Sequence, residues 1–323
     1  MLIKYSKAFP YWVITLFSLV NLRFILQEYA WADDWSFYAG YHSDKNVNAT
    51  EHLIGFRPLL QIIFDVAWRN LDSIADLRLL RLIGLLGTLI LSSYSYFLLR
   101  KVGIAAFTSL SFAIGILFLP TFQIYQKWAT TFPYSWGALF ALVSWQAFRN
   151  KHKHISFLLM LVTFLIYQPA ATFGLVILFA ELLKSKKFPE KSYLYCLQLI
   201  MAFISATLAS RVLLIVYGIE PKARSGVINS FAEFAEKIVW IVSRPFVLSF
   251  RPFQWDSPNS LELSLIVPII FICMIAVWVN SREFKACAYL LSQSFLIFFL
   301  MLLPLLPISE NQIEFRVLPS TSA

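Results

Sequence analysis

Long apolar runs separated by short polar connections make up most of this sequence. A helix that crosses a lipid bilayer needs about 20 mostly apolar residues, and many of the runs reach or approach that length. Single spanning helices fit the runs near Phe9–Ile25, Leu79–Leu99, Val102–Leu119, Phe132–Phe148, Tyr193–Tyr217, Leu261–Val279 and Cys287–Leu306. The pattern predicts an all-α polytopic membrane protein rather than a soluble domain.

The run from Ile155 to Leu183 is too long for one straight span and short for two. Tyr167-Gln168-Pro169 interrupts it, because proline cannot continue a helix and restricts the residue before it. Basic clusters flank both ends of the run. If both clusters lie on one side of the membrane, the segment must enter and return. We predict two short helices over 155–183, shielded by neighbouring protein, and about nine membrane helices in all.

Connections rich in lysine and arginine alternate along the chain with connections that contain few of them. The basic pieces are the N-terminal stretch, Arg100-Lys101, 149–154, 184–191 and 280–285. Most acidic residues fall in the other connections, above all in the larger segments 27–78 and 218–260. Basic connections usually face the cytoplasm. The sequence thus predicts one transmembrane domain over 1–323 in a cell membrane, with a cytoplasmic N-terminus and two large outer loops.

Composition agrees with the pattern of runs. Hydrophobic residues make up 59% of the chain and charged residues 14%, against about 25% charged residues in soluble domains. The net charge of +9 does not indicate nucleic acid, because the basic residues form short clusters between apolar runs. The cysteines follow no metal or disulfide spacing, and His42 and His52 of the first outer loop follow no ligand spacing either.

The first outer loop, 27–78, carries the most distinctive residues. Ala32-Asp33-Asp34-Trp35 follows the first span closely, and Gly55-Phe56-Arg57-Pro58 opens a helical pattern in which Pro58 suits the first turn. An apolar face with a polar face opposite predicts an amphipathic helix at the outer membrane interface. The apolar face is Leu59, Ile62, Ile63 and Val66, and the polar face is Gln61, Asp65 and Arg69.

The second outer loop, 218–260, also predicts an interfacial helix. Phe231, Phe234, Ile238 and Ile241 repeat at helical spacing, with Lys237 and two glutamates off that stripe. We expect the stripe to pack on the helical bundle.

With these motifs the chain resembles the GT-C superfamily of membrane glycosyltransferases. It looks most like the bacterial serotype-converting family that glucosylates O-antigen from an undecaprenyl-phosphate sugar. The residues that carry the resemblance are Asp33-Asp34, Gly55-Phe56-Arg57-Pro58-Leu59, Tyr167-Gln168-Pro169 and Phe315-Arg316-Val317-Leu318-Pro319. The resemblance implies a GT-C-like helical bundle in a bacterial inner membrane. Family members generally have further helices after this point, so we expect the chain to be incomplete after Ala323.

The implied reaction moves a hexose, by the resemblance glucose, from a polyprenyl-phosphate donor to a cell-surface glycan acceptor such as O-antigen. By the resemblance, Asp33 or Asp34 is the general base for the acceptor hydroxyl, and the other orients the acceptor or holds a divalent cation. Arg57 and Arg316 are then the candidates for the donor phosphate, which suits arginine forks. The sequence itself requires no cofactor.

Each of these residues has a plainer interpretation. Asp34 could cap a helix that starts at Trp35-Ser36, and Arg57 could extend to lipid headgroups as an interface anchor. The residues that could line a substrate site are Trp35, Lys127, Trp128, Tyr167 and Gln168. Lys127 and Trp128 also fit an aromatic belt in the outer turn between the third and fourth spans, and Tyr167 and Gln168 fit a structural role at the helix break.

Two other functions compete with the transferase. A transporter or flippase for a lipid-linked sugar usually carries ionisable groups near the bilayer midplane. Here the predicted spans are nearly free of charge at their centres, and the acids crowd the outer side. A non-catalytic membrane assembly protein is the third possibility.

Overall fold

Helices form all the regular structure that the computed structural model describes. It describes residues 8–30, 33–42, 51–185, 191–220, 228, 230–243 and 284–305. The N-terminal helices are α1 (Phe9–Leu19), α2 (Leu22–Ile25), α3 (Asp33–His42), α4 (Glu51–Ile54), α5 (Pro58–Arg69), η1 (Ile74–Asp76), α6 (Leu77–Val102) and α7 (Ala106–Phe118). The remaining ones are α8 (Pro120–Lys127), η2 (Ala129–Thr131), α9 (Phe132–Arg149), α10 (Lys153–Ile166), α11 (Gln168–Ala171), α12 (Gly174–Ser185), α13 (Ser192–Val216), α14 (Phe231–Ser243), α17 (Phe284–Met301) and η4 (Leu303–Leu305). The all-α prediction is confirmed for this part of the chain.

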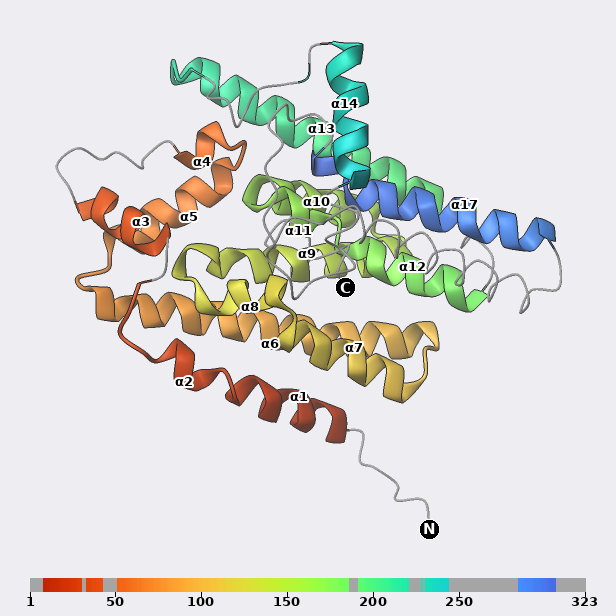
Figure 1. Ribbon diagram of the computed structural model, residues 1–323, viewed down its shortest axis with the longest axis horizontal. Helices are drawn as coiled ribbons and strands as arrows, with labels where there is room; N and C mark the ends of the chain where they lie inside the picture. Colours follow the sequence, from red (N-terminus) through yellow and green to blue (C-terminus); the bar gives the residue numbers. More distant parts are fainter. Residues whose placement is uncertain are drawn as a thin grey trace.

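The long helices stack in layers around α9. Helix α6 packs on α7 and α9, α9 packs on α10, and α10 packs on α13. Figure 1 shows this order from α1 at one side of the molecule to α13 and α17 at the other, with α14 projecting from the last layer. The short helices α3, α4 and α5 gather at one end of the stack.

Two of the described helices are long and apolar enough to cross a membrane, Ile74–Val102 and Ser192–Val216. Shorter apolar helices are Pro10–Leu19, Ala106–Phe118, Lys153–Ile166 and Ser292–Met301. The first predicted span, Phe9–Ile25, is divided into α1 and α2 by a turn at Val20-Asn21. The number of about nine spans therefore stays a prediction, and the predicted span Leu261–Val279 lies outside the described residues.

The interruption predicted at Tyr167-Gln168-Pro169 is present. Tyr167 is extended, with φ −159° and ψ 107°, so α10 ends at Ile166 and Pro169 falls in the first turn of α11. Helix α12 then runs to the level at which α9 ends, because Arg149 Nε lies 3.5 Å from Glu181 Oε1. The segment 155–183 thus forms separate helices, and its two flanks lie at the same end of the stack.

Several basic connections meet at that end. The last turn of α12 reaches the end of α6. A Cβ added to Gly103 would lie 3.7 Å from the Cε of Lys184. Gln198 of α13 donates from Nε2 to the Lys153 carbonyl at 2.6 Å. The end of α6 at Gly103, the connection 149–153 and the end of α12 at Lys184 are therefore neighbours, and α3–α5 occupy the opposite end (Figure 1).

Helix α14 departs from its predicted packing. Ile241 near its end is 2% exposed, but Phe231 at its start is 86% exposed. Lys237, predicted to lie off the packing stripe, is 3% exposed, and its Nζ is 4.1 Å from the centroid of the Trp240 ring. Within the described residues, the apolar stripe of α14 is therefore buried at its Ile241 end and exposed at its Phe231 end.

Gly84 lets α6 approach the start of α9. A Cβ at this position would lie 2.4 Å from the Tyr125 carbonyl oxygen and 3.3 Å from the Phe132 Cα. Both atoms belong to the backbone, so no side chain can turn aside to make room. The contact of α6 with α8 and α9 depends on the absence of a side chain here.

We expect Gly84→Ala to lower the free energy of unfolding by about 1–3 kcal/mol, because the added methyl group forces the helices apart. Thermal unfolding of the purified chain measures this. Gly115→Ala is the matched control, since nothing lies within 4 Å of its added Cβ and helix propensity favours alanine by about 1 kcal/mol. Equal stability of the two variants would contradict the close approach.

Candidate functional site

The carboxylate of Asp34 is completely buried and binds main-chain amides. Its Oδ2 accepts from the Ala129 N–H at 3.2 Å, and its Oδ1 accepts from the Thr130 N–H at 2.9 Å. These amides open η2, which leads directly into α9. The first amides of a helix have no acceptor within that helix, and the helix N-terminus favours negative charge. Asp34 thus caps a helical segment 95 residues farther along the chain.

The interpretation that Asp34 caps a helix starting at Trp35-Ser36 is wrong, because α3 begins at Asp33 and contains Asp34 in its first turn. Both oxygens of Asp34 are occupied by η2. Asp33 is partly exposed, and Trp35 is 53% exposed. Of the acidic pair, Asp33 is therefore the member that a molecule from outside can reach.

Lys127 and Trp128 directly precede the amides that Asp34 binds. The Nζ of Lys127 donates to Gln123 Oε1 at 3.1 Å, and burial lowers the pKa of the lysine. Trp128 is partly buried against the main core. Chain continuity therefore places both residues beside the buried carboxylate of Asp34.

Arg57 lies where the first outer-loop motif meets the helix break. Its Nε donates to Gln168 Oε1 at 3.1 Å, and its Nη1 donates to the Tyr134 hydroxyl at 3.4 Å. Its guanidinium carbon is 4.9 Å from the centroid of the Tyr167 ring. Among the described residues, no carboxylate forms an ion pair with Arg57. A half-buried guanidinium in this state suits an incoming anion.

Gln168 holds the turn that carries Arg57. Its Nε2 donates to the Gly55 carbonyl at 3.2 Å and to the Phe56 carbonyl at 2.7 Å, while its Oε1 accepts from Arg57. Phe56 has a φ of 57°, which is unusual for a bulky residue. The Arg211 guanidinium of α13 lies 5.0 Å from the Phe56 ring centroid. These contacts fix a strained turn from which Pro58 starts α5, as predicted.

Tyr134 and Tyr167 complete the surroundings of Arg57. Their rings stack in parallel, with centroids 3.7 Å apart. Tyr134 belongs to the first turn of α9, a few residues after the amides that Asp34 binds. Asp34 of the acidic pair therefore binds the segment that leads into α9, and Arg57 binds the first turn of α9.

The structure thus gathers most of the predicted site residues around one helix end. The residues that contact or adjoin the start of α9 are Asp34, Arg57, Lys127, Trp128, Tyr167 and Gln168. Asp33 and Trp35 follow α3 to this region with more exposed side chains. Arg316 lies outside the described residues.

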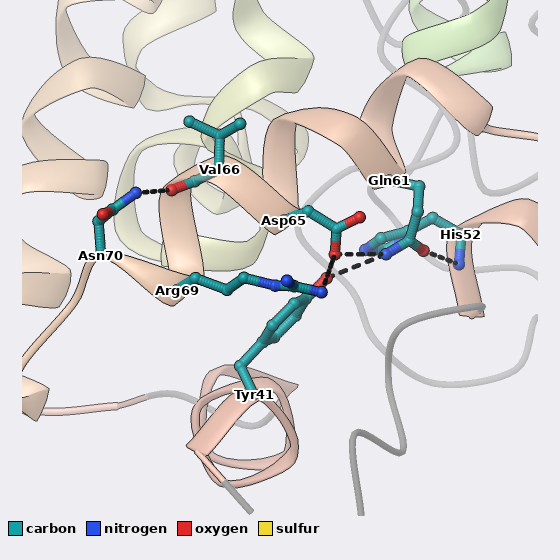
Figure 2. A network of polar contacts seen from close by, with 7 residues as sticks. All are labelled: Tyr41, His52, Gln61, Asp65, Val66, Arg69 and Asn70. Atoms are coloured by element: carbon teal, nitrogen blue, oxygen red, sulfur yellow. Dashed lines mark hydrogen bonds and ion pairs between the residues drawn. The ribbon is translucent and has the colours of Figure 1, made fainter.

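A second polar network joins α3, α4 and α5, and Figure 2 shows it. The Tyr41 hydroxyl and Gln61 Nε2 both donate to Asp65 Oδ1, at 3.1 Å each, and Gln61 Oε1 accepts from the His52 N–H at 3.2 Å. Arg69 approaches Asp65 at 3.9 Å, one helical turn away. Burial, with Asp65 adding to it, raises the pKa of Tyr41.

One residue of the predicted polar face of α5 is buried in this network. Gln61, assigned to the polar face, is 3% exposed because its amide binds three partners inside the loop. Ile62 and Val66, assigned to the apolar face, are 59% and 64% exposed. The apolar edge of α5 therefore faces away from the packed loop.

Arg81 is a site residue that the sequence pattern did not select. It lies one turn into α6 and is completely buried, with its guanidinium bound to backbone carbonyls of the segment before α3. The only sign in the sequence is a second arginine three residues after Arg78 at the start of an apolar run.

The histidines of the first outer loop have structural contacts. His42 lies within hydrogen-bond distance of the Tyr38 and Leu71 carbonyls, at 2.8 and 2.7 Å. The His52 ring stacks on Phe37, with centroids 5.1 Å apart. Within the described residues, no group of three or more His, Cys, Asp or Glu is placed to hold a metal ion.

Comparison with known proteins gives no match: no family model, curated protein or solved structure is similar to this chain.

We expect Asp34→Ala to lower the free energy of unfolding by about 2–4 kcal/mol, because two buried amides lose their acceptor. Asp34→Asn should cost less, since the amide oxygen still accepts one bond. Asp33→Ala is the control, with an expected change below about 1 kcal/mol at a partly exposed position. Denaturant unfolding followed by circular dichroism measures all three. Equal losses at both positions would contradict the capping role of Asp34.

Proposed function

We propose that this protein is a membrane glycosyltransferase that moves a hexose, glucose in the first instance, from a polyprenyl-phosphate donor to a cell-surface glycan. The reaction would take place on the outer side of a bacterial inner membrane. The observation that carries the proposal is that Asp34 of the acidic pair binds η2, which leads into α9, while Arg57 binds Tyr134 in the first turn of α9. A carboxylate and an anion-binding guanidinium at one site are the groups that this transfer needs.

A membrane location is supported by the exposed face of α13. Its exposed apolar residues recur every three or four positions along the whole helix. They are Tyr193, Leu197, Met201, Ile204, Leu208, Val212 and Ile215, exposed between 44% and 78%. Helix α6 carries a similar stripe of Leu79, Ile83, Leu86, Ile90 and Phe97. Stripes of this length suit contact with lipid chains.

The ends of the helices support a consistent orientation. The connection at 149–154, the end of α12 and the end of α6 carry basic residues and lie together. The opposite end carries α3–α5 with the acidic pair (Figure 1). This separation of charge fits basic connections in the cytoplasm and the site on the outer side.

In the proposed reaction, Asp33 is the general base. The acceptor hydroxyl attacks the anomeric carbon of the donor hexose, and its proton passes to the Asp33 carboxylate. The bond between that carbon and the phosphate oxygen breaks, and its electron pair leaves with the polyprenyl phosphate. Asp34 is assigned the anchoring role, because both of its oxygens already accept backbone amides.

Arg57 is assigned to the phosphate of the donor. The Nε and Nη1 contacts to Gln168 and Tyr134 orient the guanidinium, and a planar fork held in place suits bidentate binding of phosphate. Negative charge grows on the phosphate as the glycosidic bond breaks. A cation held there stabilises the transition state more than the bound donor.

We expect Asp33→Asn to lower hexose transfer at least about 100-fold, because the amide cannot accept the acceptor proton. Arg57→Lys should lower it about 10- to 100-fold by removing the fork. Mass spectrometry of the surface glycan, in cells with and without the gene, measures the added hexose. Asp72→Asn and Arg69→Lys are matched controls on exposed positions of the same loop.

Three outcomes are distinguishable. Loss of transfer in the Asp33 and Arg57 variants alone, at equal protein level, supports the proposal. Full transfer by Asp33→Asn would remove Asp33 from the role of base. No transfer by the inserted natural chain would favour a transporter of a lipid-linked sugar or a membrane assembly protein.

Topology provides a separate prediction. In a chain whose cysteines are replaced by serine, Asp72→Cys should react with a membrane-impermeant maleimide added to intact cells. Asn150→Cys, in the basic connection after α9, should react only after the membrane is permeabilised. Both positions are exposed in the structure. Reaction of both cysteines in intact cells would contradict the proposed orientation.

A further inference from the structure

The guanidinium of Arg81 binds three backbone carbonyls at once. Nε donates to the Ile25 carbonyl at 3.1 Å, Nη1 to the Tyr29 carbonyl at 2.6 Å and Nη2 to the Gln27 carbonyl at 2.5 Å. Its central carbon lies 4.3 Å from the centroid of the Tyr29 ring. Each nitrogen of the guanidinium thus binds a different residue, either at the end of α2 or in the segment that follows it.

This segment is irregular, so its carbonyls need such a partner. Helix α2 ends at Ile25, and the last carbonyls of a helix have no N–H donor within the helix itself. Buried backbone carbonyls left without a donor are costly. Arg81, which is completely buried, supplies donors from a neighbouring helix and so determines the path of the chain as it leaves α2.

The same segment leads into the acidic pair. Tyr29 is bound by Arg81 of α6, and Asp34, five positions later, is bound by the amides of η2. Helix α6 and η2 pack against each other. Arg81 therefore binds the chain before α3, and η2 binds Asp34 in the first turn of α3. Both partners of this region belong to the α6–η2 contact.

Charge links the same groups. The positive charge of Arg81 and the negative charge of Asp34 interact. Tyr29 lies near both of them, and burial raises the pKa of its phenol, with Arg81 opposing the shift and Asp34 adding to it. A buried cation near the end of a membrane helix usually has a functional partner, and here that partner region is the start of α3.

We propose that Arg81 is a positioning residue for the acidic pair, because its guanidinium folds the segment between α2 and α3 and so fixes the place of Asp33 and Asp34 against η2. This inference rests on the proposed transferase function. Arg81 does not touch the sugar or the phosphate in this assignment. It acts by holding the base at the distance and angle at which proton transfer is efficient.

Arginine is required for this geometry. The carbonyls of Ile25, Gln27 and Tyr29 are reached by separate nitrogens of one rigid plane. Lysine keeps the charge but has all of its donors on a single nitrogen. Arg81→Lys therefore separates the geometric role of the side chain from its charge.

The test uses the full chain with Arg81→Lys, Arg81→Gln and the control Arg78→Gln. Arg78 lies in the same turn of α6 but is 45% exposed and pairs with Glu28 at 3.6 Å. With undecaprenyl-phosphate glucose as donor, we expect kcat per folded molecule to fall on the order of 100-fold in both Arg81 variants. The KM for this donor should change less than about threefold, since Arg57 is held by other residues.

Hydrogen exchange of the purified chains provides the readout that does not depend on turnover. In both Arg81 variants the amides of Ala129 and Thr130 should exchange faster, because Asp34 no longer stays on them, whereas α13 and the Arg78→Gln control should match the natural chain. Unchanged exchange at these amides overturns the proposal. Faster exchange with an unchanged kcat also overturns it, since Arg81 would then support the fold alone. A natural chain that transfers nothing overturns the proposed function and the catalytic role of Arg81 together, whatever the exchange shows.

Discussion

The amides of Ala129 and Thr130 open η2, the short helix that leads into α9. They need acceptors that their own helix cannot provide, and the carboxylate of Asp34 accepts from both. Because the acceptor belongs to α3, the first outer loop is bound to η2 and, through it, to α9, the central helix of the stack. The bond is made between a buried anion and a helix N-terminus, where charge and hydrogen bonding act in the same direction. The position of Asp33 follows from this attachment, since it precedes Asp34 in the same helical turn.

The second attachment of the loop depends on the break between α10 and α11. Because Tyr167 leaves the helical conformation, the Gln168 amide can bind the carbonyls of the turn at Gly55 and Phe56. That turn contains a phenylalanine at φ 57°, a conformation that costs about 1–3 kcal/mol and persists only where the surroundings determine it. Gln168 and Arg211 supply those surroundings. Strain of this kind, next to a guanidinium without an ion-pair partner among the described residues, is typical of a ligand-binding turn.

Local patterns in the sequence were sufficient for the long helices and for the break. The apolar run of α13 and the proline after Gln168 act within their own segments, and the structure has both where they were predicted. Contacts between distant segments were not predictable in this way. Gln61 was assigned to the exposed face because its position in α5 says nothing of Tyr41 and His52. The carbonyl partners of Arg81 and the amide partners of Asp34 likewise depend on segments that meet only in the folded chain.

The exposed apolar residues support the proposed membrane location better than they support a protein partner. The stripes on α6 and α13 belong to helices in different layers, separated by α9 and α10 (Figure 1), so one docking protein could not cover both. Water would have to solvate two rows of large apolar side chains, which is unfavourable in proportion to their area. A solvent that surrounds the stack relieves both stripes at once, and hydrocarbon does so without any specific contact.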